Sequence, residues 1–226
     1  MKEFLKRDIF SKIVKCMMIL VSGVVAGYLA LALVYALPTD GMERHVQESY
    51  DMIKEEGISP RLIKGYESTR LDNYSDGLIL NSAIYDGDES VWEKAAAIYQ
   101  HTYEGENYYF SLLKHLDSEP GEITGSYERD WHGYLVYVKL LLLFMNYADI
   151  RMLNMVIQIA LVVYLIYLMK KKELGKYIPA VGMMLIFLTW SILFYSIEYS
   201  AMFYVLMLAS VLVICKNRNI ISKNRV

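Results

Sequence analysis

CMMILVSGVVAGYLALALVYAL (Cys16–Leu37) decides the fold class, because its 22 residues carry no charge. At about 1.5 Å of rise per residue, a helix of this length crosses a hydrocarbon layer of about 30 Å. The preceding residues 1–15 are basic, and positive charge flanks the cytoplasmic end of a span, so they are predicted to lie in the cytoplasm. A cleaved signal peptide is the competing interpretation, but its apolar region is normally about 7–15 residues long.

The composition indicates a membrane protein with one polar insert. Hydrophobic residues make up 55% of the 226 residues and gather into long runs near both ends of the chain. Between Asp40 and Arg151 there are 21 acidic and 10 basic residues, whereas the other polar segments are basic. This segregation is typical of membrane topology, and it excludes nucleic acid as a partner, which would require a basic polar domain.

Three further apolar runs follow the polar insert: residues 152–169, 177–197 and 199–215. Four lysines place the loop 170–176 in the cytoplasm, and residues 216–226 form a second basic segment. The sequence therefore predicts an all-α protein with four transmembrane helices in a bacterial cytoplasmic membrane, with both termini cytoplasmic.

The insert, residues 38–133, is predicted to be a mostly helical extracytoplasmic domain. Ser90–Glu93 matches a capping box that opens a helix over residues 91–101, and 118–126 is rich in turn-forming residues. No strand of useful length is expected. The segment 134–151 is expected to be interfacial or re-entrant, because its apolar part is too short to span and is interrupted by Lys139.

The stretch LDNYSDGLIL (Leu71–Leu80) carries two candidate catalytic residues, Asp72 and Asp76, just before an apolar segment. Such a carboxylate can take a proton from an acceptor hydroxyl. The structural alternative is that acidic side chains at the start of a helix interact favourably with its dipole. Two carboxylates of this region can also share a divalent cation, Mg²⁺ or Mn²⁺, that bridges the oxygens of a phosphate.

Basic side chains near the outer membrane face are candidates for binding a phosphorylated lipid. Arg151 lies at the outer end of the second span, and Arg129 and His132 lie near the start of the interfacial segment. A guanidinium group binds phosphate through a bidentate fork. The alternatives are that Arg151 extends to lipid headgroups, that His132 anchors the interface, and that Glu198 is solvated in a tight turn.

This layout resembles the N-terminal part of a bacterial GT-C-type polytopic membrane glycosyltransferase, which uses a polyprenyl-phosphate-linked sugar. The shared features are a basic start with one span, a large outside loop with an early Asp motif, and an aromatic–Arg passage, WHGYLVYVKLLLLFMNYADIR (131–151), leading into the second span. The resemblance implies Asp76 as catalytic base, Arg151 as phosphate-binding residue and Glu198 as a metal partner. Members usually have eight or more spans, so a truncated or split form is expected.

The expected function is sugar transfer from a polyprenyl-phosphate donor at the outer membrane face, in the assembly of an envelope glycan or glycolipid, by a complete, partial or inactive member. Membrane lipid, the lipid-linked sugar and a second membrane subunit are the expected partners. The competing hypothesis is a non-enzymatic scaffold whose acidic loop binds another envelope protein. A transporter is disfavoured, because no predicted span carries an internal charge.

Overall fold

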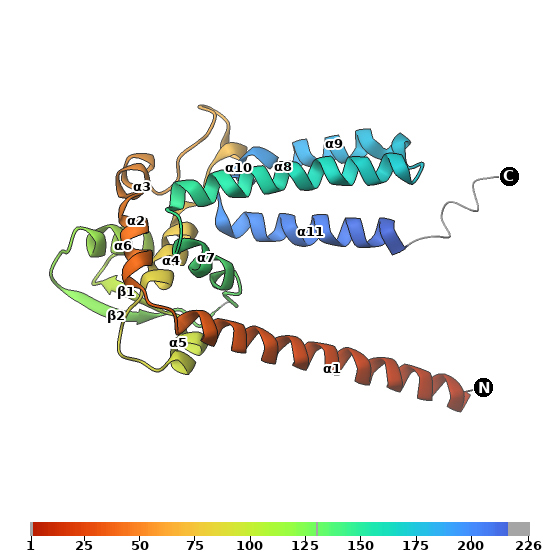
Figure 1. The fold of residues 1–226 in the computed structure, drawn as a ribbon, viewed down its shortest axis with the longest axis horizontal. Helices are drawn as coiled ribbons and strands as arrows, with labels where there is room; N and C mark the ends of the chain where they lie inside the picture. Colours follow the sequence, from red (N-terminus) through yellow and green to blue (C-terminus); the bar gives the residue numbers. More distant parts are fainter. Residues whose placement is uncertain (1, 130, 217–226) are drawn as a thin grey trace.

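The structure is a computed structural model that describes residues 2–129 and 131–216 and is mostly helical. A polar domain lies at one end, and long helices extend from it to the other end (Figure 1). The predicted tail beyond residue 216 falls outside the described residues. The polar domain contains α2 (Asp40–Gln47), α3 (Tyr50–Glu56), η1 (Glu67–Thr69), α4 (Asn73–Ile84), α5 (Val91–Ala97), β1 (Tyr99–Tyr103), α6 (Tyr108–Leu116), β2 (Glu122–Ser126) and α7 (Leu135–Leu142).

Three helices are long and apolar enough to cross a membrane: residues 9–35 of α1 (Lys2–Tyr35), α8 (Tyr147–Lys171) and α11 (Ile197–Lys216). They cover nearly all of the predicted first, second and fourth spans. Large apolar side chains on all three point outward, among them Ile19 and Val163, as expected for helices surrounded by lipid. The start of α1 and the end of α11 lie at the same end of the molecule (Figure 1). These helices indicate a membrane-embedded protein.

The third predicted span, 177–197, is not a single helix. After the short η2 (Gly175–Tyr177), the helix α9 (Ile178–Phe187) ends shortly before Thr189, and α10 (Trp190–Leu193) is a single turn. Thr189 has a left-handed backbone with φ of 47°, which interrupts the helical hydrogen-bond pattern. The apolar composition of residues 177–197 predicts one continuous span, but composition does not indicate where a helix is interrupted.

Two polar side chains of α8 satisfy carbonyl groups at the end of α10, where the chain leaves the helix before α11 begins. The Asn154 Nδ2 donates to the carbonyl oxygens of Leu193 and Phe194, both at 2.9 Å. The Gln158 Nε2 donates to the Leu193 carbonyl at 2.7 Å, and its Oε1 accepts from the Trp190 indole at 3.0 Å. In an apolar environment an unpaired carbonyl is costly, so these amides allow the chain to break here.

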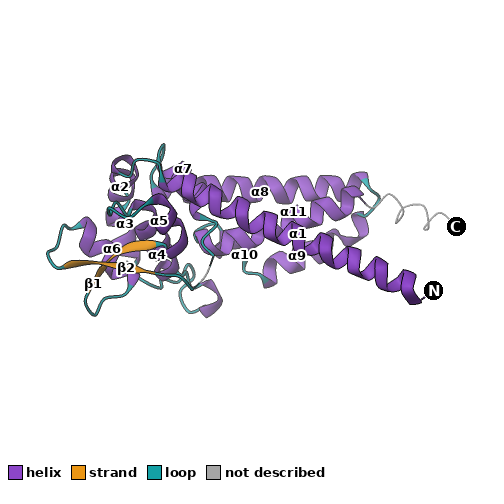
Figure 2. Ribbon diagram, turned by 90° about the horizontal axis from the view of Figure 1, so that it is seen from below, coloured by secondary structure: helices purple, strands orange, loops and turns teal. Residues whose placement is uncertain are grey.

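The all-α prediction is wrong in one place, because β1 and β2 form an antiparallel pair with Tyr99 opposite Ser126. Figure 2 shows the two strands in the polar domain, away from the chain termini. The helix α5 does open on the predicted capping box of Ser90 and Glu93. It ends earlier than predicted, because Ile98 adopts a left-handed conformation with φ of 52°, and the chain continues in an extended form as β1.

The helix α4 is at the centre of the polar domain, and every residue from Asp76 to Ile84 is buried. It packs against α6, β1, α7 and α2. A Cβ atom at Gly77 would lie 2.8 Å from the Tyr109 Cα, so only glycine permits this close approach of α4 and α6. The Asn81 side chain binds the backbone of His101 through two hydrogen bonds of 2.8 Å, which attach β1 to α4.

The segment 134–151 divides into α7 and the first turn of α8, joined by a short linker. Lys139, in the middle of α7, is fully buried. Its Nζ donates to the Ala83 carbonyl at 2.5 Å and lies 4.8 Å from the centroid of the Tyr35 ring. Burial, with a smaller contribution from Lys94, lowers the pKa of Lys139 from 10.5 to about 7.

Replacement of Lys139 by methionine is expected to change how stability depends on pH. Between about pH 7 and 10 the unfolded wild type binds more protons at this lysine than the folded protein does, so wild-type stability rises with pH. Methionine has similar length and no charge, so Lys139→Met should unfold on the order of 5 °C higher at pH 7. This difference should shrink by pH 10. Thermal unfolding in detergent at both pH values checks this prediction, and a difference that is independent of pH would contradict it.

Candidate functional site

The Asp76 carboxylate joins the polar domain to the starts of two long helices. It lies in the first turn of α4 and is only 2% exposed. Its Oδ1 accepts a hydrogen bond of 3.0 Å from the backbone amide of Ile197, the first residue of α11, and its Oδ2 accepts from the Tyr147 hydroxyl at the start of α8. An anion at the N-terminus of a helix is favourable, because it meets unpaired amides and the positive end of the dipole.

Burial raises the pKa of the Asp76 carboxyl to about 7. The hydrogen bond from Tyr147, the positive charge of Arg151 and the Ile197 amide each oppose this effect, and the nearby Asp72 adds to it. A carboxyl group with this pKa can both accept and release a proton near neutral pH.

Arg151 lies one turn into α8 beside this carboxylate and is 6% exposed. Its Nη1 donates to both Glu56 oxygens, at 2.7 and 2.9 Å, and its Nη2 donates to the Asn73 Oδ1 at 3.1 Å. The guanidinium carbon lies 4.4 Å from the centroid of the Tyr147 ring. The Nε–H has no hydrogen-bond partner among the residues that the structure describes. One donor of the Arg151 guanidinium is therefore buried and left unsatisfied within the described chain.

An apolar cavity of about 390 Å³ lies beside Arg151, between α7, α8 and α11. Leu140 and Ile157 in its wall are partly exposed, so the cavity opens on the outer surface of the helices. A second cavity of about 190 Å³ also borders Arg151, together with Glu56. Apart from Arg151, the larger cavity is lined by Tyr137, Leu140, Leu141, Ile150, Leu153, Asn154, Ile157, Phe194, Ile197, Ser200 and Tyr204.

Asp72 has a capping role in the structure. It is the N-cap of α4, where its side chain accepts from the Ser75 amide at 3.2 Å and from the Ser75 hydroxyl at 2.8 Å. The Tyr199 hydroxyl approaches its Oδ2 at 3.5 Å. Glu198 is exposed in the first turn of α11, directly after the amide that binds Asp76. Asp72, Asp76, Arg151 and Glu198 therefore gather where α4, α8 and α11 meet.

His132 and Arg129 belong to another part of the surface. His132 is buried, with its ring against the rings of Tyr127 and Tyr134, and its Nδ1 is hydrogen-bonded to the Tyr134 hydroxyl. The adjacent Trp131 lies against Gly27 of α1. Arg129 is exposed. None of the contacts described above for Asp76 and Arg151 involves either residue.

Three residues of the site had no predicted role there: Glu56, Asn73 and Tyr147. Tyr147 precedes Arg151 by four residues, a helical spacing that places the ring beneath the guanidinium. This spacing could have predicted that Tyr147 belongs to the site. Glu56 comes from a different helix, α3, and one acid among many in the loop carries no signal of its own. Comparison of the chain with protein-family models, with curated proteins and with solved structures finds no match. The chemistry of the site has to be derived from these side chains.

The Asp76 carboxyl predicts a pH-dependent difference between two variants. Because its folded pKa is raised above the unfolded value near 3.9, wild-type stability falls as the pH rises from about 4 to 7. Asp76→Asn keeps an acceptor for the Ile197 amide and removes the charge. It should therefore gain several degrees of thermal stability over wild type between pH 5 and pH 8.

Asp76→Ala is the matched comparison, because it leaves the Ile197 amide and the Tyr147 hydroxyl without their partner. It should cost about 1–3 kcal/mol relative to Asp76→Asn at both pH values. Parallel pH profiles for wild type and Asp76→Asn would show that the carboxyl does not titrate in this range.

Proposed function

We propose that this protein is a membrane glycosyltransferase-like protein of the GT-C type, which binds a polyprenyl-phosphate-linked sugar at the outer face of a bacterial cytoplasmic membrane. The observation that carries the proposal is the buried, unsatisfied Nε–H of Arg151, a residue that lines an apolar cavity. A phosphorylated lipid needs a cationic donor for its head and an apolar surface for its chain, and both occur here within one site.

The position of the cavity supports a lipid ligand over a soluble one. It lies among the outer turns of apolar helices and has partly exposed apolar side chains in its wall. A polyprenyl chain can enter such a cavity from the lipid without crossing water, which favours burial of its apolar surface. Arg151 would then meet the phosphate at the end of the cavity nearest the polar domain.

In the proposed reaction, Asp76 is the general base. The acceptor hydroxyl attacks the anomeric carbon of the sugar, the bond from that carbon to the phosphate oxygen breaks, and polyprenyl phosphate leaves. The hydroxyl proton passes to Asp76, whose pKa of about 7 suits this role. For this step the acceptor has to replace the Tyr147 hydroxyl at Oδ2, because Asp76 is buried beneath α8 and α11.

The Mg²⁺ or Mn²⁺ ion expected at Asp76 and Glu198 does not fit this arrangement. Hydrogen bonds from Tyr147 and Ile197 already occupy both Asp76 oxygens, and Glu198 is exposed to solvent. A cation at this position would have to displace both bonds. In the proposed transfer Asp76 is therefore the base, Asp72 is a helix cap, and no metal ion takes part.

The proposed topology has four spans, with α9 and α10 together forming the third. The long helices and α9 alternate in direction along the long axis (Figure 1). This alternation supports the placement of both termini and the loop 170–176 on the cytoplasmic side, and of the polar domain outside. The exposed apolar surface of α1 is where a second membrane subunit would bind.

A non-enzymatic scaffold is the second candidate, and one observation favours it. Apart from the Arg151 Nε–H, the polar atoms of Asp76 and Arg151 are bonded within the chain, as expected for a structural joint between the polar domain and the helices. In that case the acidic polar domain would bind another envelope protein, and the site would have no lipid substrate.

Binding of a polyprenyl phosphate to the purified protein in nanodiscs separates the two candidates. Leu140→Trp places a bulky ring at the cavity wall and should lower affinity at least tenfold, whereas Val163→Trp, on the exposed face of α8, should leave affinity unchanged. Arg151→Lys keeps the charge and loses the Nε–H, so about tenfold weaker binding is expected, the equivalent of about 1.4 kcal/mol. Equal affinity in all four proteins would support the scaffold.

Sugar transfer should depend on the Asp76 charge. Asp76→Asn is expected to abolish transfer, since the amide cannot accept the acceptor proton, while membrane insertion and polyprenyl-phosphate binding remain. The measurement is product formation from a polyprenyl-phosphate sugar with an envelope-glycan acceptor. Full activity of Asp76→Asn would exclude Asp76 as the base.

A further inference from the structure

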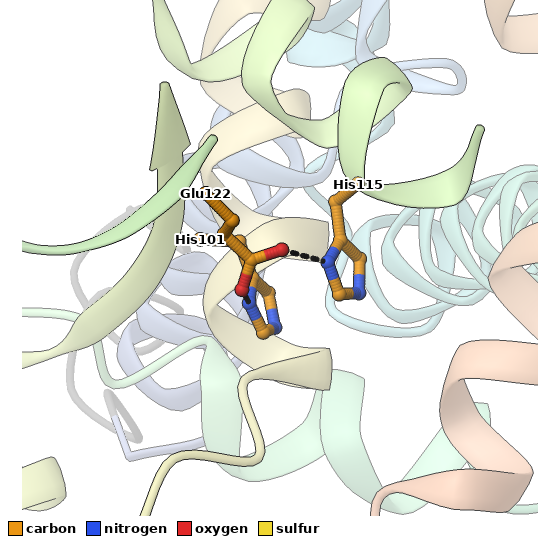
Figure 3. A group of neighbouring side chains, drawn as sticks. All are labelled: His101, His115 and Glu122. Atoms are coloured by element: carbon orange, nitrogen blue, oxygen red, sulfur yellow. Dashed lines mark hydrogen bonds and ion pairs between the residues drawn. The ribbon is translucent and has the colours of Figure 1, made fainter. Parts of the chain in front are cut away.

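Three potential metal ligands meet in the polar domain, well separated in sequence. His101 comes from β1, His115 from the last turn of α6, and Glu122 from the start of β2. One ligand atom from each lies within 4.8 Å of the other two. Figure 3 shows the carboxylate of Glu122 with one oxygen directed at each imidazole ring. Among the residues that the structure describes, no other group of three such side chains comes together in this way.

Both imidazoles direct the same ring nitrogen toward Glu122. The His101 Nδ1 lies 2.6 Å from the Glu122 Oε1, and the His115 Nδ1 lies 2.8 Å from the Oε2. The rings are stacked with centroids 3.6 Å apart. Two imidazolium ions at this separation would repel each other, and burial together with His115 lowers the pKa of His101. Two positive charges are therefore disfavoured on this stacked pair.

The second nitrogen of each ring, Nε2, is left without a hydrogen bond in this arrangement. The Nε2 atoms of His101 and His115 are buried and have no hydrogen-bond partner in the described structure. The His101 side chain is only 2% exposed, so water does not readily satisfy its Nε2. The His101 Nε2 faces the Asp86 carboxylate at 3.8 Å, and the His115 Nε2 faces the Glu43 carboxylate at 3.6 Å. A neutral imidazole that donates from Nδ1 presents a lone pair at Nε2, which is unfavourable beside a carboxylate.

We propose that His101, His115 and Glu122 form a binding site for Zn²⁺. An ion on the Nδ1 side takes the place of the two protons, and each ring then carries its proton on Nε2, facing Asp86 or Glu43. Ligating histidines commonly donate their other ring N–H to a carboxylate in this way. The proposal thus accounts for the shared orientation of the rings and for the two unpaired Nε2 atoms. It is independent of the proposed sugar transfer.

The ligand types favour Zn²⁺ over the ions that bind only oxygen. Imidazole nitrogens suit Zn²⁺ and neighbouring transition metals, whereas Mg²⁺ and Mn²⁺ favour carboxylates, carbonyls and water. Two ligands at the corners of a zinc tetrahedron lie about 3.4 Å apart, so the nitrogen–oxygen pairs have to separate by less than about 1 Å. The stacked rings also have to tilt toward the ion. Glu122 is partly exposed, which leaves room for water as the fourth ligand.

A bound ion would connect α6 to both strands of the sheet. The two strands pair with each other through their backbones, and α6 packs against β1. The loop between α6 and β2 contains Gly121 and the left-handed Ser118, and it has no disulfide. Zinc would hold the two ends of this loop together, and its binding free energy would add to the stability of the folded domain.

Zinc content and thermal unfolding of the full chain in detergent test the site. After equilibration with Zn²⁺ and desalting, wild type should hold one zinc per chain by elemental analysis. His115→Gln and Glu122→Gln should each bind at least tenfold more weakly. Zinc at 100-fold excess over its Kd should raise the unfolding temperature of wild type by roughly 5 °C and leave that of both variants unchanged. Co²⁺ should give the visible absorption bands of a tetrahedral nitrogen–oxygen site.

His45→Gln is the matched control, because His45 is an imidazole of the same domain that contacts α7 through the Leu142 carbonyl. It should retain the zinc of wild type. A folded wild type without zinc, equal zinc in His115→Gln and wild type, or loss of zinc from His45→Gln alone would each overturn the proposal. If Mg²⁺ displaces Zn²⁺ at millimolar concentration, the nitrogen ligands are not engaged and the site is wrong.

Discussion

The buried carboxylate of Asp76 accepts hydrogen bonds from the first residues of both α8 and α11. A charge so deeply buried is tolerated only when donors and an opposite charge compensate it, and Arg151 supplies that charge. Arg151 is fixed in turn by Glu56 and Asn73. The orientation of the polar domain on the helices therefore depends on a small set of polar contacts, and two of its members, Arg151 and Ile197, also line the larger cavity.

The long apolar helices could be predicted from the sequence, since a run such as 16–37 reports its environment by composition alone. The break at Thr189 and the β1–β2 pair could not. The short helix α10 that follows Thr189 depends at its end on donors from Asn154 and Gln158, which bind the carbonyls of Phe194 and Leu193, 40 and 35 residues away. The strand β1 begins where Ile98 turns into the left-handed region. Nothing in the local pattern of either segment indicates these contacts.

Only part of the candidate site could be predicted, because some of its residues have no signal in their own stretch of sequence. Asp76 and Arg151 stood out as ionisable residues at the ends of apolar segments, and the structure brings them together. Their partner Glu56 lies in an acidic helix where many carboxylates look alike. His101, His115 and Glu122 come from three elements, and two of these, β1 and β2, were not predicted as strands. Without the strand pair, the sequence offers no reason to place His101 beside Glu122.

The interrupted third apolar segment has a consequence for biosynthesis. α9 has ten residues, about 15 Å of helix, which is half of the hydrocarbon layer. Such a segment gains too little on its own to leave the translocon for lipid. The carbonyls at the end of the following turn, α10, accept hydrogen bonds from Asn154 and Gln158, and the Asn154 Oδ1 accepts in turn from the Tyr204 hydroxyl of α11. On the proposed topology, α8 to α11 therefore have to partition into the bilayer as one unit, after Tyr204 has left the ribosome.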